Sequence, residues 1–89
     1  MSYDLLINTR FENKWYVYKG LDNLSLAFSI SEKEVKDNSS FVFIREVKSS
    51  GADVWKHFYY RARKYSTLES VHSSTNTYLS SKFLLCEGK

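Results

Sequence analysis

The sequence predicts an α+β fold: a small antiparallel sheet of three or four strands, then an amphipathic helix packed on one face, with a short C-terminal helix or strand. Two observations lead to this class. Apolar residues recur with a period of two in the first half of the chain, which is typical of strands. Over residues 53–65 the period changes to that of a helix. The chain has 89 residues, so we expect a single small domain over residues 1–89.

Four strands are expected before the helix. Each is marked by alternating apolar residues or by a run of aromatic and β-branched residues, and the alternation over residues 24–30 is the cleanest. A turn over residues 20–23 precedes that strand. The polar stretch after it has room for a short helical turn, because Ser31 and Glu34 have the spacing of a capping box. The strands are expected at residues 3–9, 15–18, 24–30 and 41–47.

The second strand divides its aromatic residues between two faces. Trp15 and Val17 share one face, and Tyr16 and Tyr18 share the other. If the helix covers the Trp15 face, the two tyrosines are left on the open face of the sheet. Exposed aromatic rings there could anchor a protein partner or stack on bases. The alternative is that a second buried face forms under the C-terminal segment.

The helix is expected over residues 53–65. With 100° per residue, starting from Val54, the apolar residues fall within an arc of about 140° and the charged residues occupy the opposite arc. Ser50 or Asp53 can cap its first turn. Such a helix would cover the sheet with one side and face solvent with the other.

The excess of positive charge is concentrated in that segment. The chain carries a formal charge of +3, and residues 53–65 hold four basic residues against one acidic residue, so the remainder is neutral. The charged arc is either a plain solvated face or a face that attracts anionic partners. We expect an acidic protein surface, a nucleic-acid-handling protein complex, or nucleic acid itself as the partner. The residues expected to bind it are Lys56, His57, Tyr60, Arg61, Arg63 and Lys64, together with Tyr16 and Tyr18.

The last 24 residues leave several structures open. Ser66 and Glu69 have capping-box spacing, which suggests a short helix. Residues 73–77 are typical of a loop, and residues 78–85 could form a last strand or the end of a helix. The apolar spacing also permits one long helix, and periodicity does not choose among these.

The sequence holds no pattern typical of a reaction centre. It has no glycine-rich loop to hold a phosphate, and the spacing of His57, His72 and Cys86 matches no zinc site. We therefore expect no catalytic residue, no metal, no cofactor and no enzymatic activity. No apolar run reaches the roughly 18 residues needed to span a bilayer, and the single cysteine favours a reducing compartment such as the cytoplasm.

These observations favour a small non-enzymatic binding protein that acts by surface complementarity on a protein partner. Residues with AT-rich codons are common and Gly, Ala, Arg and Pro are rare, which is typical of a low-GC genome. This favours a phage or mobile-element inhibitor of a host nucleic-acid-handling or defence factor, acting in the host cytoplasm. Two alternatives stay open: a nucleic-acid-binding module that uses the basic helix face, and a homo-oligomeric accessory protein, such as a homodimer, that pairs through a sheet edge or the Tyr16/Tyr18 face.

Overall fold

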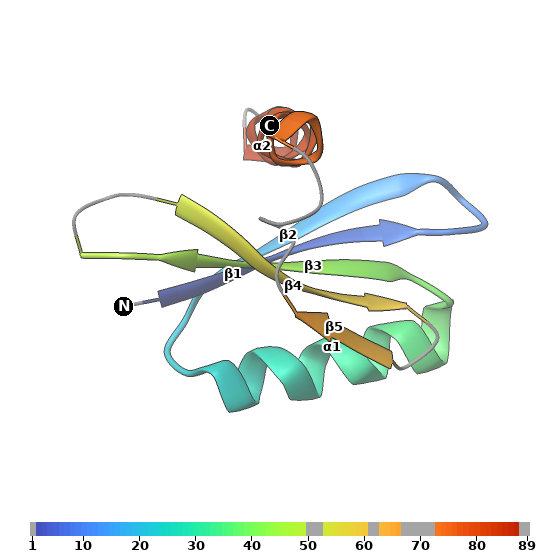
Figure 1. Ribbon diagram of the computed structural model, residues 1–89. Coiled ribbons are helices and arrows are strands. Elements are labelled where there is room, and N and C mark those ends of the chain that lie inside the picture. The colour runs from blue at the N-terminus through green and yellow to red at the C-terminus, as the bar shows by residue number, and fades with distance from the viewer. Residues whose placement is uncertain (1, 50–52, 61–62, 67–72, 88–89) are drawn as a thin grey trace.

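A computed structural model describes residues 2–49, 53–60, 63–66 and 73–87. Neighbouring strands are antiparallel and lie in the order β2-β1-β3-β4-β5. Figure 1 shows this sheet as a middle layer, with α1 on one face and α2 on the other. The α+β class is confirmed, with one strand more than expected in the part of the chain described. The elements are β1 (Ser2–Thr9), β2 (Lys14–Leu21), α1 (Leu24–Asn38), β3 (Phe41–Val47), β4 (Asp53–Tyr60), β5 (Arg63–Ser66) and α2 (Ser73–Glu87).

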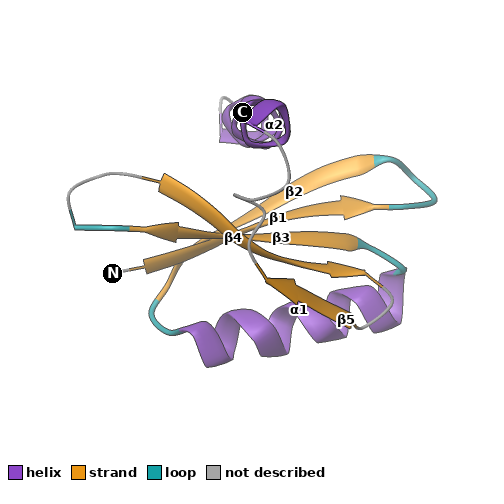
Figure 2. Ribbon diagram, viewed as in Figure 1, coloured by secondary structure: helices purple, strands orange, loops and turns teal. Residues whose placement is uncertain are grey.

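The sheet has an apolar core on each face, because each face is covered by a helix (Figure 2). The central strand β1 supplies consecutive residues to both cores, and Leu5, Leu6 and Ile7 are all buried. A strand buried on both faces is continuously apolar rather than alternating. On the α1 face the buried residues are Leu5, Ile7, Ala27, Val35, Val42, Ile44 and Tyr59, and on the α2 face they are Leu6, Trp55, Leu79 and Phe83.

The strand expected at residues 24–30 is wrong, because these residues begin α1. Asn23 caps the helix: its Oδ1 accepts a hydrogen bond from the Leu26 N–H at 2.7 Å. Ala27, Ser31 and Val35 follow one another at helical spacing and are buried against the sheet. The apolar residues that alternate in the sequence are spread around this helix, so that Leu26 is exposed. The capping-box segment at Ser31 is helical, as part of this longer helix.

The helix expected at residues 53–65 is also wrong, since this segment forms β4 and β5. Arg45 opposes Trp55 in the register, whereas Ile44 opposes His57, so Lys56 is the extra residue of a β-bulge. Trp55 packs in the α2 core, and Tyr59, four residues later, packs in the α1 core. Because this segment has buried residues on both faces and contains a bulge, its apolar residues lose the period of two that is typical of strands. The spacing that remains resembles that of an amphipathic helix.

The C-terminal segment is a helix, which confirms one of the expected alternatives. α2 includes residues 73–77, which were expected as a loop, and excludes a last strand within residues 78–85. Leu79 and Phe83, one turn apart, are buried in the core beneath it. Ser66 ends β5, and the rest of the short helix expected from Ser66 lies outside the described residues. Neither of the two helices described is long and apolar enough to cross a membrane.

Candidate interaction surface

The strand β2 lies at one edge of the sheet formed by the described strands. Among the described strands it pairs only with β1, and its eight residues make it twice as long as β5 at the opposite edge. An edge strand exposes a row of backbone N–H and C=O groups that can pair with another chain. β2 also contains one Trp and two Tyr residues, which are enriched in strands and in protein interfaces.

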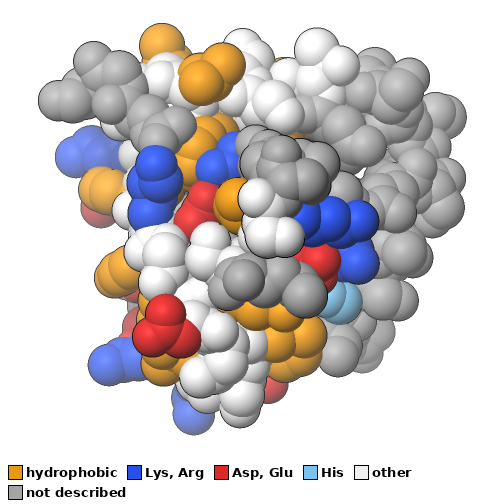
Figure 3. Space-filling view, turned by 90° about the vertical axis from the view of Figure 1, so that its left-hand side faces the viewer, with side chains coloured by type: hydrophobic (Ala, Val, Ile, Leu, Met, Phe, Trp, Pro, Cys, Tyr) orange, Lys and Arg blue, Asp and Glu red, His pale blue; other side chains and the backbone are white. Residues whose placement is uncertain are grey.

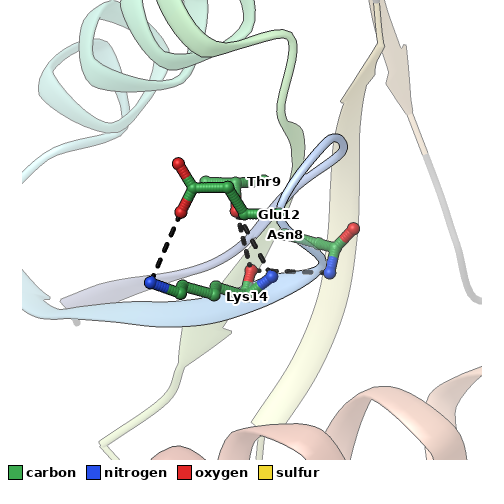
Figure 4. A network of polar contacts seen from close by, with 4 residues as sticks. All are labelled: Asn8, Thr9, Glu12 and Lys14. Carbon is green, nitrogen blue, oxygen red and sulfur yellow. Dashed lines mark hydrogen bonds and ion pairs between the residues drawn. The ribbon is translucent and has the colours of Figure 1, made fainter.

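The start of β2 is held by a polar network in the β1–β2 turn (Figure 4). The Lys14 N–H donates to Thr9 Oγ1 at 3.3 Å, and the Asn8 side-chain amide donates to Asn13 Oδ1 at 3.3 Å. The Lys14 ammonium lies 3.5 Å from a carboxylate oxygen of Glu12. The positive φ of Asn13, 52°, closes the turn. This network sets the position at which the edge begins.

The other end of β2 is shaped by a bulge at Gly20. The register against β1 shifts between Tyr3 and Leu5, and Gly20 has a φ of 72°, in the region that favours glycine. The Gly20 N–H donates to Asp4 Oδ1 at 2.9 Å. The regular part of the free edge is therefore short, over residues 14–18.

Asp4 also links β2 to the α2 core, because its other carboxylate oxygen pairs with the Arg45 guanidinium. Both side chains are buried, and the guanidinium carbon of Arg45 lies 3.5 Å from the centre of the Phe83 ring on α2. Such a buried, ring-covered pair is inaccessible to a partner. We assign it a structural role in fixing the bulge beneath α2.

Tyr16 and Tyr18 lie on the α1 face of β2, because they oppose Ile7 and Leu5 of β1. Their exposed fractions are 48% and 44%. The Trp15 face is covered by α2 rather than by a helix at residues 53–65. The α1 face is covered as well, yet both tyrosine side chains remain accessible at the edge of the sheet.

A groove of about 300 Å³ lies between the two tyrosines and α1, and Glu34 lines its helix side. Ile7 and Val17 complete the lining. Glu34 is half-buried, and its carboxylate accepts a hydrogen bond from the Asn38 side-chain amide at 3.0 Å. The lining therefore includes two tyrosines and a glutamate whose carboxylate is hydrogen-bonded to Asn38.

The α2 side of β2 carries a second apolar surface. Leu84 and Leu85 point outward and are 66% and 62% exposed. Leu85 and Cys86 line a groove of about 450 Å³ that they share with the start of β2. The Lys82 ammonium lies 5.8 Å from the centre of the Trp15 ring. Exposed apolar groups thus flank the β2 edge on both sides.

The basic residues predicted to share one helix face do not form such a face. The Lys56 ammonium lies 3.6 Å from a carboxylate oxygen of Glu46. His57 is half-buried on the α1 side, with its ring edge-on to Phe28 at 5.3 Å. On the face drawn in Figure 3, Lys and Arg side chains are interspersed with Asp and Glu. Tyr60 ends β4, Arg63 and Lys64 are consecutive positions of β5, and Arg61 lies outside the described residues.

The fold clearly changes the acidity of Tyr59. Burial, and secondarily the nearby negative charge of Glu32, raises the pKa of Tyr59 to about 12. Its phenol therefore stays protonated as part of the α1 core. Within the described ranges, no group of three or more His, Cys, Asp and Glu side chains could hold a metal ion.

Sequence reasoning named Tyr16 and Tyr18 but missed Glu34 and Leu85, which lie next to them in space. The cap at Asn23 was the available signal, since a helix beginning there places Glu34 on the same side as the buried Ala27 and Ser31. Comparison with protein-family models, curated proteins and solved structures finds no match to this chain.

Proposed function

We propose that the chain is a non-enzymatic binding protein that takes up an extended strand of a protein partner along the free edge of β2. The observation that carries this proposal is the exposure of Tyr16 and Tyr18 on β2, which lies at the edge of the sheet formed by the described strands. Strand addition of this kind gains affinity from backbone hydrogen bonds, and pockets beside the edge provide specificity for alternate side chains.

Three further features support this surface over the basic residues of β4 and β5. The turn network and the Gly20 bulge fix both ends of the edge, so little order has to be imposed on binding. Tyrosines supply large contact area with few rotatable bonds. By contrast, the sequence predicts the basic residues on one face of a helix, whereas the described part of that segment forms strands.

The biological form we propose is a phage or mobile-element inhibitor that binds a host factor in the cytoplasm. Its support is the low-GC residue usage and the free Cys86. The homo-oligomeric alternative uses the same edge, with β2 of a second copy as the added strand. The nucleic-acid alternative loses its main support with the helix at residues 53–65.

The test is selection of ten-residue peptides displayed on yeast against the immobilised protein. We expect enriched peptides to slow hydrogen exchange of amides in residues 14–18, because added backbone hydrogen bonds protect the edge. Replacing Tyr16 and Tyr18 together by Ala should weaken binding at least tenfold, on the order expected for two interface tyrosines. Phe11→Ala, which removes an 84% exposed ring from the turn, is the matched control and should leave binding unchanged.

Three outcomes would overturn the proposal. The first is that bound peptides slow hydrogen exchange of amides in α2 alone and not in β2. A sedimentation mass twice that of the chain, lost in the tyrosine double variant, would favour the homodimer. Steeply salt-dependent binding of DNA or RNA that survives the double variant would favour the nucleic-acid module.

A further inference from the structure

We infer that the groove between Tyr16, Tyr18 and Glu34 receives a lysine or arginine side chain from the strand that docks on β2. This inference rests on the proposed function and adds the chemistry of the partner. Its first support is the lining itself, because two aromatic rings and a carboxylate are the groups that attract an organic cation.

The carboxylate selects among occupants of the groove. An uncharged aliphatic side chain would cover Glu34 without replacing the hydrogen bonds that water makes to it, which costs free energy. A basic side chain packs its aliphatic stem against the rings and brings its charged end to the carboxylate. Among the described residues, neither lysine nor arginine lines the groove, so the chain itself does not supply this cation there.

The opposite face of the sheet shows what these groups do when a cation is present. There, Lys82 lies 5.4 Å from the centre of the Tyr78 ring, and Arg45 lies over Phe83. Tyr16 and Tyr18 have no such cation over their rings within the described parts of the chain. The fold thus satisfies its aromatic rings with its own cations on the α2 face and leaves a receptive pair on the α1 face.

Asn38 helps to hold the Glu34 carboxylate in place before a partner binds. Its side-chain amide holds one carboxylate oxygen of Glu34 at 3.0 Å, one helical turn away, which limits the rotation of the carboxylate. A charge held in place beside a groove loses less entropy on pairing than one on a free surface side chain.

The test uses two capped seven-residue peptides of alternating threonine and valine, one with a central lysine and one with norleucine in its place. Binding is followed by NMR titration of the full-length protein, with residues 14–18 and the Glu34 carboxyl carbon as reporters. We expect the norleucine peptide to bind about tenfold more weakly, the combined effect of one cation–aromatic contact and one partly screened ion pair. Glu34→Gln should reduce this ratio to about threefold, whereas Glu32→Gln, on the side of α1 near Tyr59, should leave it unchanged.

The outcomes separate the two proposals. Equal binding of both peptides at β2, with no effect of Glu34→Gln, would overturn the cation site and leave the edge-binding function standing. If neither peptide shifts residues 14–18, the edge-binding function fails and the cation site fails with it. A stronger response to the norleucine peptide would show that the groove selects apolar side chains and would also refute the cation site.

Discussion

On the α2 side of the sheet, Arg45 is a buried charge paired with the buried Asp4 and covered by Phe83. Removing one partner of a buried ion pair leaves the other charge uncompensated. We expect Arg45→Met to lower the free energy of unfolding by about 3–5 kcal/mol, measured by urea denaturation. The partly exposed pair of Lys56 with Glu46 is the comparison, and Lys56→Met should cost less than about 1 kcal/mol.

The double variant Asp4→Asn with Arg45→Met gives the control for this prediction. Asparagine keeps an oxygen that can accept the Gly20 hydrogen bond, and no charge is left buried. Most of the lost stability should therefore return. A single Arg45→Met variant as stable as Lys56→Met would contradict the structural role assigned to this pair.

Tyr59 makes stability depend on pH in the alkaline range. The pKa of its phenol is raised from 10.0 to about 12 in the folded state, so the unfolded chain loses this proton first as the pH rises. The stabilising contribution is complete below pH 10 and is lost between pH 10 and pH 12. Relative to Tyr59→Phe, we expect the wild type to lose about 1 kcal/mol per pH unit in that window, measured by urea denaturation. If the free energy of unfolding of the two proteins falls equally between pH 10 and pH 12, the raised pKa of Tyr59 is refuted.

At the scale of the element, α1 depends on its first turn. Asn23 satisfies an N–H that the helix itself leaves unpaired. Asn23→Ala should lower the free energy of unfolding by about 1 kcal/mol, and Asn23→Ser should restore most of it, since serine is also a good N-cap residue. Chemical denaturation followed by far-UV circular dichroism measures both. Equal loss in the two variants would argue against the cap.

The helix α2 offers the same substitution on its inner and outer sides. Leu79 is 1% exposed and packs in the α2 core, whereas Leu84 is 66% exposed. Leu79→Ala should cost about 2–5 kcal/mol through lost contacts and a cavity, and Leu84→Ala should change stability by less than about 0.5 kcal/mol. Urea denaturation of the two variants measures these changes in the free energy of unfolding. Equal changes in both variants would mean that α2 does not pack on the sheet as described.

For the whole molecule, both apolar cores share the central strands of one sheet. Losing either helix would expose one face of that sheet to water, so we expect the two cores to unfold together. Tryptophan fluorescence reports on the α2 core through Trp15 and Trp55, and far-UV circular dichroism reports on all elements. Coincident urea transitions would support the expected single domain over residues 1–89, and an earlier fluorescence transition would refute it.

Much of the architecture could be predicted from composition and local pattern. Residues 3–9, 15–18 and 41–47 are strands as expected, because their β-branched and aromatic content favours extended backbone whatever covers it. Residues 24–30 and 53–65 were assigned to the wrong type of element. In the first, Ala27 faces the sheet although the alternation predicts it on the solvent side of a strand, and in the second a bulge shifts the pattern.

In the candidate site, too, some residues can be placed from the sequence and others cannot. Tyr16 and Tyr18 could be placed together on one face of a strand from their spacing alone, since alternate strand residues always share a face. Their neighbour Glu34 is distant along the chain and reaches them only through the packing of α1 on the sheet. Local preferences along a chain amount to about 1 kcal/mol or less per residue, so the burial of two cores overrides them and decides which distant side chains meet.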